Sequence, residues 1–340
     1  MFFSFIVKKY VKNLLLILFS LSLFYIIIDA IGNFSKLPSA INLQVLYFYY
    51  NFLYSTDIFY PLSLVFAFLL TLLEMVKFNE LISLYSVGFS IKKILKPFLI
   101  ISFFVFFIFI IFGISKYAYS KEYAKAILNK QKYTTANLFL KYQNNIIYIE
   151  KINPLLQEAY NMEIFVIRNN NLVKAIFVKK AIFKDDKWFC KNAKIIYFYK
   201  DKIIKEQKDI SFLKNFKPKI LSNLKKLNSI SFYDAFIAIK VFKDVNINNI
   251  LAILFFKIFT PLSLIGLIVI FLIYVPIHPK VSNLSFFMIK SVFITILVWG
   301  IEILMYKFVK QGVMSPYSLI LPTLLVYGYI LYLIRRKNGF

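Results

Sequence analysis

Six long apolar segments, three before and three after a polar middle section, dominate this chain. A helix needs about 20 mostly apolar residues to cross the hydrocarbon core of a bilayer. The segments that meet this requirement lie at roughly 13–33, 58–76, 97–115, 250–275, 284–306 and 316–334. Hydrophobic residues make up 60% of the chain, which is well above their share in soluble globular domains. We therefore predict a helical membrane protein with six transmembrane helices and one large inserted domain.

The predicted domains follow from these segments. Residues 1–115 hold the first three helices, residues 116–249 form the inserted domain with helical linkers, and residues 250–340 hold the last three helices. Pro61 lies near the start of the second segment, where the first turn of a helix tolerates a residue without an N–H. The second helix is accordingly predicted to begin shortly before Pro61.

Basic residues in the short loops predict how the chain is oriented, because loops rich in lysine and arginine stay on the cytoplasmic side. One side carries Lys8, Lys9, Lys12, Lys77, Lys92, Lys93, Lys96, Lys280, Arg335, Arg336 and Lys337. The opposite side carries Lys36, Lys307 and Lys310. We therefore expect both termini in the cytoplasm and the inserted domain in the periplasm or exterior. The lysines of the long domain do not oppose this orientation, since long domains translocate regardless of charge.

Charge and motif content exclude several functions. The net charge of +26 comes almost entirely from lysine; codon bias and proximity to anionic lipid account for it, and we predict no nucleic-acid partner. Cys190 and His278 are the single residues of their types, so no zinc-type cluster or internal disulfide is expected. No glycine is followed by lysine, as a phosphate-binding loop requires, and no hydrolase motif occurs. The chain is therefore expected to have no catalytic site, metal or bound cofactor.

The inserted domain reads as a series of strands. Stretches rich in Ile, Val, Phe and Tyr, separated by polar turns, lie at 146–152, 161–168, 172–183, 187–199 and 202–205. Residues 116–132 and 229–247 look helical and would link the domain to the membrane. We predict a β-sandwich or open jelly roll. Both faces carry apolar residues, so either a closed core or a groove for acyl chains fits, and Phe165 and Phe177 are trial positions for the groove.

The loop between the second and third apolar segments carries a short amphipathic helix. Asn79 is a candidate N-cap, Glu80 complements the helix N-terminus, and Gly88 can take the left-handed conformation that ends a helix. The helix is predicted to present Leu81, Leu84 and Tyr85. Such a helix either docks into a groove of a partner protein or anchors the loop in lipid.

Five ionisable residues lie in or next to the apolar segments. Charges at membrane depth are costly and usually face a cavity or a partner. For Asp29, Lys257 and Glu302 we predict an inward-facing polar site. Lys36 and Lys307 lie near helix ends, where snorkelling to the interface is the simpler interpretation. All five are candidate residues for a lipid headgroup or a cavity.

With these residues identified, the chain resembles the lipopolysaccharide export permeases of the LptF/LptG type over essentially its whole length. The most specific part is the run Asn79-Glu80-Leu81-Ile82-Ser83-Leu84-Tyr85-Ser86-Val87-Gly88-Phe89-Ser90. Tyr60-Pro61-Leu62-Ser63 and Lys257-Ile258-Phe259-Thr260-Pro261-Leu262 support it. Ile28-Asp29 favours the G type, although Ile26 and Asn33 stand where that type commonly has basic residues.

The resemblance implies a fold, partners and a site. The fold would be six helices in a bacterial inner membrane, with a periplasmic β-jelly roll between the third and fourth. The partners would be a paralogous permease, a cytoplasmic ATPase dimer of the LptB type that uses ATP, LptC/LptA-type periplasmic bridge proteins, and lipopolysaccharide. The helix comprising Asn79, Glu80, Leu81, Leu84, Tyr85 and Gly88 would be the coupling helix that receives the ATPase stroke.

Two other classes of function compete with a transport permease. A membrane-anchored sensor or assembly scaffold would bind a ligand or partner through the β domain and would need no ATPase. A secondary transporter fits poorly, because such folds usually show repeat symmetry and interrupted helices around a site at the membrane midplane. Co-purification of a nucleotide-binding subunit would distinguish the permease from the scaffold.

Overall fold

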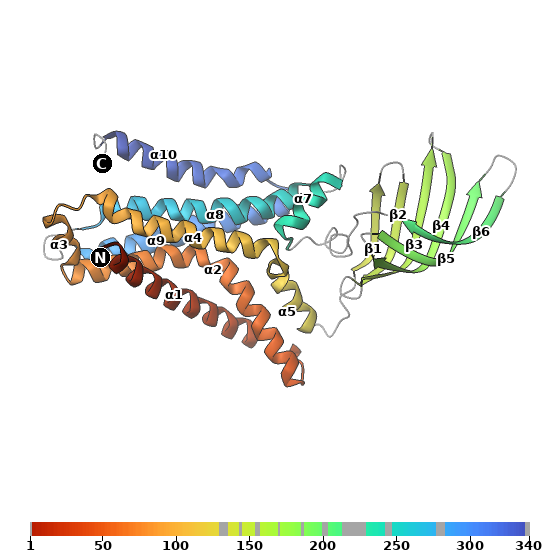
Figure 1. The fold of residues 1–340 in the computed structure, drawn as a ribbon, viewed down its shortest axis with the longest axis horizontal. Coiled ribbons are helices and arrows are strands. Elements are labelled where there is room, and N and C mark those ends of the chain that lie inside the picture. Colours follow the sequence, from red (N-terminus) through yellow and green to blue (C-terminus); the bar gives the residue numbers. More distant parts are fainter. Residues whose placement is uncertain are drawn as a thin grey trace.

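Six long apolar helices form one bundle in the computed structural model, and a single β-sheet lies beyond one end of it (Figure 1). The structure describes residues 2–128, 135–142, 145–153, 157–168, 171–184, 187–198, 203–212, 229–241, 247–276 and 283–336. The predicted loop charges Lys280 and Lys337, and His278, lie outside these residues. The helices long and apolar enough to span a membrane are α1 (Phe2–Gly32), α2 (Ile41–Lys77), α4 (Ile91–Ile114), α8 (Ile247–Tyr274), α9 (Leu284–Lys310) and the η3–α10 unit (Pro316–Ile320 and Leu321–Arg336).

The second helix differs from its prediction, because α2 begins at Ile41 and not shortly before Pro61. Its 37 residues span about 55 Å at 1.5 Å per residue, against the roughly 30 Å of a hydrocarbon core. The additional turns, residues 41–57, contain four tyrosines, two asparagines, one glutamine and Asp57, so the sequence did not predict them as part of a membrane segment. They are helical because they pack against α1 and against α5 (Ser120–Leu128).

Helices α2 and α8 form the centre of the bundle, and their buried residues make a continuous apolar core with α1 and α4. Two glycines allow close packing around this core. A Cβ on Gly266 of α8 would lie 2.5 Å from Val326 Cγ1 of α10, and one on Gly113 of α4 would lie 2.6 Å from the Phe232 ring. Helices α1 and α9 bury few residues and keep long apolar faces exposed.

Helix α1 is attached to the core by polar contacts on its buried face. The Tyr10 hydroxyl lies 2.8 Å from Ser102 Oγ of α4 and donates to the Leu64 carbonyl of α2 at 3.1 Å. Asn13 Nδ2 donates to Thr71 Oγ1 of α2 at 3.0 Å. Tyr10 and Asn13 are three residues apart and so share one helix face. These contacts orient α1 against α2 and α4.

The inserted domain is an antiparallel sheet of six strands, which confirms the predicted class of a helical membrane protein with an inserted β domain. The strands are β1 (Thr135–Tyr142), β2 (Asn145–Asn153), β3 (Glu158–Arg168), β4 (Asn171–Lys184), β5 (Lys187–Phe198) and β6 (Ile203–Phe212). Their order is β1-β2-β3-β4-β5-β6, so each described strand pairs with its neighbour in sequence. Strand β1 was not predicted, and the described topology is a curved meander.

In four of the strands, the alternation of buried and exposed residues slips by one position, and this slip decides which residues face the core. Each of these strands has one step of three positions between buried residues, and in β5 this step coincides with a register shift against β6 between Cys190 and Ala193, as at a β-bulge. The buried positions are 147, 149 and 152 in β2, 159, 162 and 164 in β3, 175, 176, 178, 181 and 183 in β4, and 188, 190, 193 and 195 in β5. Asn161 and Asn192 take positive φ values of 47° and 57° at the slip, which asparagine tolerates better than most residues. The slip keeps every large apolar side chain of this set, including Trp188, on one face.

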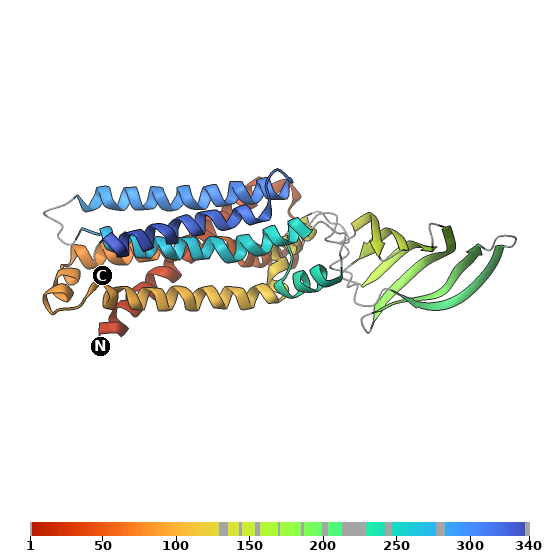
Figure 2. The same ribbon diagram turned by 90° about the horizontal axis from the view of Figure 1, so that it is seen from above.

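The helices that join the sheet to the membrane part lie at the same end of the bundle. The 3₁₀ turn η2 (Lys116–Tyr119) and α5 follow α4, and α7 (Phe232–Val241) precedes α8. Their positions lie within the two stretches predicted to be helical linkers. Both termini and the short helix α3 (Glu80–Ser86) lie at the opposite end from the sheet (Figures 1 and 2).

Candidate functional site

A stripe of polar residues runs along one face of the additional turns of α2. Tyr47, Asn51, Tyr54 and Asp57 are spaced by four, three and three residues, and such spacing places side chains on the same helix face. We call these four residues the α2 polar stripe. Each contacts a polar group on another helix, so the stripe collects groups from α1, α5 and α8.

Asp29 of α1 binds the first half of the stripe. Its Oδ2 accepts hydrogen bonds from the Tyr47 hydroxyl and, at 3.0 Å, from Asn51 Nδ2. Tyr47 is fully buried. Two neutral donors thus compensate a carboxylate at the end of an apolar helix, and Asp29 is held inward as the sequence predicts.

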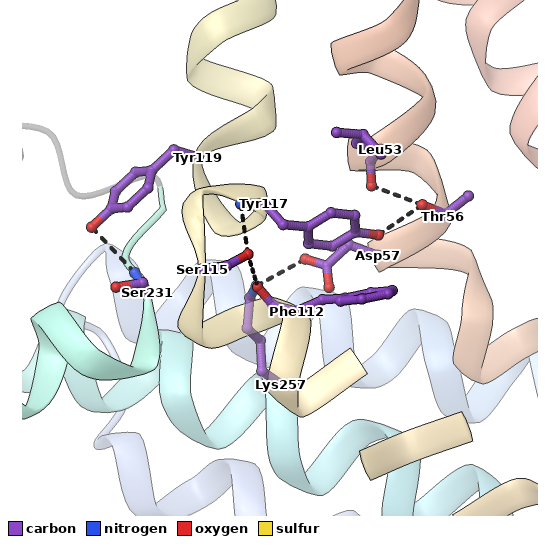
Figure 3. Close-up of polar contacts among 9 residues, drawn as sticks. All are labelled: Leu53, Thr56, Asp57, Phe112, Ser115, Tyr117, Tyr119, Ser231 and Lys257. Carbon is purple, nitrogen blue, oxygen red and sulfur yellow. Dashed lines mark hydrogen bonds and ion pairs between the residues drawn. The ribbon is translucent and has the colours of Figure 1, made fainter. Parts of the chain in front are cut away.

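Lys257 of α8 forms an ion pair with Asp57, the last residue of the stripe. Lys257 Nζ lies 2.8 Å from Asp57 Oδ2, and the two side chains are 18% and 17% exposed. Next to Asp57, the Thr56 hydroxyl lies 2.7 Å from the Tyr117 hydroxyl of η2 (Figure 3). The ion pair therefore joins two central helices where the chain leaves α4 for the sheet.

Asp57 was not among the predicted site residues, because it lies just before the predicted second helix at 58–76. The signal was present in the four-three-three spacing of the polar stripe, which a helix beginning at Ile41 would have revealed. Lys121 of α5 was also missed. Its Nζ donates to the Tyr54 hydroxyl and lies 4.3 Å from the centre of that ring. Burial lowers the pKa of Lys121, and the Asp29 carboxylate opposes this shift.

Glu302 of α9 is separate from the stripe and is 1% exposed. The Ser263 hydroxyl of α8 donates to its Oε1 at 2.5 Å. Its Oε2 accepts no hydrogen bond from any residue that the structure describes. The sequence correctly predicted an inward-facing carboxyl here, but the structure does not bring it into contact with Asp29 or Lys257.

Lys36 and Lys307 lie apart from the other candidates. Lys36 ends the exposed 3₁₀ turn η1 (Phe34–Lys36) between α1 and α2. Lys307 is exposed in the last turn of α9. Both positions allow the ammonium group to reach water or headgroups at a membrane surface. Neither side chain enters the interior site.

The amphipathic helix exists as α3, but its caps and its buried face differ from the prediction. Gly88 has the expected left-handed conformation with a φ of 85°. Asn79 precedes the helix with a φ of 58° and makes no side-chain cap, because its left-handed backbone turns the chain directly after α2. The prediction that Leu81 is presented at the helix surface is wrong, whereas the docking of α3 on a partner stays a prediction. Leu81 is fully buried, and Leu84 and Tyr85 pack partly buried against the helical core.

Glu80 at the start of α3 is bound to α1. Lys9 Nζ donates to both carboxylate oxygens of Glu80, at 2.5 and 2.6 Å. The two side chains are 24% and 26% exposed, so the pair is mostly shielded from water. The packing of Leu81 and this ion pair together fasten α3 to the membrane helices. The sequence indicated Lys9 only as one of the basic residues that predict the membrane orientation. Nothing in its sequence context predicted an ion pair with Glu80.

In the sheet, the buried face is that of Met162, Ile164, Ile176 and Val178, and not that of the trial positions Phe165 and Phe177. Phe165 and Phe177 lie on the other face of the sheet, with ring centres 6.3 Å apart in an edge-to-face contact. A groove of about 1,210 Å³ lies against the sheet, and Phe177, Lys179, Lys191 and Lys194 are among its lining residues.

Comparison with known protein families agrees with this architecture. The family model described as "Lipopolysaccharide export system permease LptF/LptG" matches residues 4–336. No curated protein matches the chain. The family model covers both permease types and does not distinguish between them. Since the match spans almost the whole chain, from α1 through the β domain to α10, this protein belongs to the LptF/LptG family of lipopolysaccharide export permeases.

Proposed function

We propose that this chain is one permease subunit of an ABC-type complex that extracts lipopolysaccharide from the outer leaflet of the inner membrane. Membership of the LptF/LptG family supports a transport permease, and the six candidate spans support a protein that crosses the inner membrane several times. A paralogous six-helix permease would complete the pathway through the membrane. A cytoplasmic ATPase dimer would bind and hydrolyse ATP, and periplasmic bridge proteins would take the lipid from the β domain.

The division of the molecule into two ends supports this assignment. Helix α3 and both termini lie at one end of the bundle, and the sheet lies at the other (Figure 1). The basic residues Lys77, Lys92, Lys93 and Lys96 flank α3. The positive-inside rule therefore favours α3 in the cytoplasm, where an ATPase would contact it, and the sheet in the periplasm.

The observation that carries the proposal is the contact between α3 and α1. Glu80 of α3 is bound to Lys9 near the start of α1. Helix α1 bears a long exposed apolar face, which includes Leu15, Leu16, Phe19, Phe24, Ile27, Ile28 and Ile31. A displacement of α3 would thus act directly on a helix whose outer face is available to a partner permease or to lipid.

A second exposed apolar face supports the route of the lipid. Helix α9 exposes Phe286, Ile289, Phe293, Ile296, Leu297 and Leu304. Lipopolysaccharide would enter laterally between α1 of one permease and the corresponding fifth membrane helix of the other. The acyl chains would contact these apolar faces, and the lipid would then pass toward the sheet.

The first test is a mild-detergent purification of the tagged chain from its native membrane, followed by mass spectrometry and an ATPase assay. Recovery of a second six-helix permease, a cytoplasmic ATPase and bound glycolipid is expected. The second test is Glu80→Lys, which should leave membrane insertion intact while uncoupling ATP hydrolysis from lipid release. Recovery of the chain alone without ATPase activity would support the scaffold hypothesis instead.

A further inference from the structure

Glu302 is a carboxyl group buried in the membrane part of the chain. It lies on α9 and is 1% exposed. Its Oε1 lies 2.5 Å from Ser263 Oγ of α8, and its Oε2 has no hydrogen-bond partner among the residues that the structure describes. Ser263 follows Lys257 by six residues on α8, which corresponds to about 9 Å along the helix. The carboxyl therefore lies deeper in the bundle than the ion pair of Lys257 and Asp57.

The hydrogen bonds of Ser263 are complete only when Glu302 carries a proton. Ser263 Oγ lies 2.5 Å from Glu302 Oε1 and 2.9 Å from the Thr260 carbonyl oxygen. A serine hydroxyl has one hydrogen, and an ionised carboxylate only accepts hydrogen bonds. With an ionised Glu302, the hydroxyl donates to Oε1 and the Thr260 carbonyl receives nothing from it. With the neutral acid, the Glu302 O–H donates to Ser263 Oγ and the Ser263 hydroxyl donates to the Thr260 carbonyl, so both contacts are hydrogen bonds.

Glu302 forms no ion pair within the part of the chain that the structure describes. The titratable groups of the helices around it have other partners or face water. Lys257 interacts with Asp57, Lys310 with Glu122, Tyr306 with Phe256, Tyr60 with Phe109 and Tyr327 with the Leu262 carbonyl, and Lys307 is exposed. An ionised carboxylate at this depth without a counter-charge is costly. The neutral acid is therefore the favoured form of Glu302.

A cavity of about 210 Å³ lies beside this carboxyl, between α2, α4, α5, α8 and α9. Trp299 and Tyr306 line it. They stand three residues before and four residues after Glu302 on α9, and such spacing places all three on one helix face. The Thr260 side chain of α8 also lines the cavity and acts on the Glu302 carboxyl. The Thr260 hydroxyl therefore joins the carboxyl to the cavity.

The cavity reaches water at the end of the bundle next to the sheet (Figure 1). Asp57 and Lys257 line it, and their side chains keep 17% and 18% of their surface exposed. Lys121 of α5, one of the helices that join the membrane part to the sheet, lines it as well. Side-chain hydroxyls and water pass protons to one another when they lie within hydrogen-bond reach. The lining thus offers a proton a route between Glu302 and the solvent on this side.

We propose that Glu302 is a proton-binding site that exchanges its proton with the outer side of the membrane through this cavity. On release, the Thr260 hydroxyl oxygen accepts the proton of Glu302 while its own hydrogen passes to water in the cavity, and uptake reverses both transfers. The bound proton holds α9 against α8, because only the neutral acid completes the hydrogen bonds of Ser263. The site lies in one subunit and requires neither the second permease nor the ATPase. Only the naming of this side as the outer one rests on the proposed function.

The test follows the carboxyl band of the full chain in a neutral detergent by infrared difference spectroscopy. The band that Glu302→Gln removes identifies the Glu302 acid. In D₂O this band should shift to the position of the deuterated acid, because the site exchanges with solvent. Absence of the band at neutral pH would mean an ionised carboxyl, and a band that stays unshifted in D₂O would mean an acid closed off from the cavity. Either result overturns the proposal, and both need only the wild type and Glu302→Gln.

The variant Thr260→Val tests the route, because it removes the hydroxyl and keeps the shape of the side chain. The shift in D₂O should become about tenfold slower, which is the effect of one lost hydrogen bond on a rate. Thr295→Val is the matched control. Thr295 is a fully buried threonine of α9 that donates to the Ser291 carbonyl and does not line the cavity, so its loss should keep the wild-type rate.

Thr260→Ser retains the hydroxyl and should also exchange at the wild-type rate. An unchanged rate in Thr260→Val, or equal slowing in Thr260→Ser, would refute the route through Thr260. If Thr260→Val does not fold, Thr260→Ala removes the same hydroxyl without a second methyl group and must slow the shift instead. Because all these measurements use the chain without its partners, a failure of the export function would not affect them.

Discussion

Lys9 on α1 and Glu80 on α3 are 71 positions apart in the sequence, yet Lys9 Nζ donates to both carboxylate oxygens of Glu80. The pair connects the start of the first membrane helix to the start of the short helix that is proposed to contact the ATPase. The Glu80 carboxylate can hold α3 against α1, contact the ATPase partner, or do both. Variants that exchange the two charges separate these roles.

Glu80→Lys places two cations next to each other and should uncouple ATP hydrolysis from lipid release. The exchange Lys9→Glu/Glu80→Lys restores an ion pair of reversed polarity. If the pair acts by fastening α3 to α1, the exchanged protein should regain most of its export in a reconstituted release assay. If Glu80 acts on the ATPase directly, the exchanged protein should remain as defective as Glu80→Lys. Lys8→Glu, at an exposed neighbouring position, is the matched control.

The ion pair between Asp57 and Lys257 should be sensitive to loss of one partner. Asp57→Asn leaves the Lys257 ammonium mostly buried without its counter-charge, and breaking such pairs costs about 3–5 kcal/mol. The double variant Asp57→Asn/Lys257→Met removes both charges and should recover most of this loss. Denaturant unfolding of the single and double variants measures the coupling. Equal stability of Asp57→Asn and wild type would show that the pair contributes nothing to the fold.

Glu302→Gln should leave stability unchanged. Its carboxyl is 1% exposed, and no cation lies against it among the described contacts. A carboxyl buried in a membrane helix without a counter-charge is favourable only as the neutral acid, and glutamine reproduces the shape of that acid. Infrared difference spectroscopy should show a protonated carboxyl band near neutral pH that Glu302→Gln removes. Strong destabilisation by this substitution would mean that the group is ionised.

Gly266→Ala should separate α10 from α8. A Cβ at this position would lie 2.5 Å from Val326 Cγ1, and overpacking of this kind typically costs about 1–3 kcal/mol. Gly300→Ala is the control, because nothing lies within 4 Å of its Cβ position, and it should be neutral. Thermal unfolding in detergent compares the two. Restored stability in Gly266→Ala/Val326→Ala would identify the contact as the cause.

The candidate site was only partly predictable. Asp29, Lys257 and Glu302 were recognised because each interrupts a long apolar segment, and the cost of such a charge indicates a partner without naming it. Their partners were not recognised. Asn51 and Asp57 belong to turns of α2 that are helical only because α1 and α5 pack against them, and a hydropathy window cannot register that contact.

The contacts of α3 and the buried face of the sheet could not be predicted from the sequence either. Amphipathicity correctly indicated a helix at residues 80–86, but it could not show that Leu81 faces this chain's own core. In the sheet, simple alternation left both faces open. The alternation slips near Asn161 and Asn192, which take positive φ values, so the buried face can be followed only when neighbouring strands are in register.

The sequence by itself determined the membrane class, the six apolar helices, the inserted β domain and the family, because length, hydropathy and a short motif are local properties. Only the tertiary structure decided the pairing of Lys9 with Glu80, the pairing of Asp57 with Lys257, the cavity that holds Lys121, and the buried face of the sheet. These depend on distances between residues far apart in the chain. Such distances arise from helix packing and strand register, which no single segment encodes.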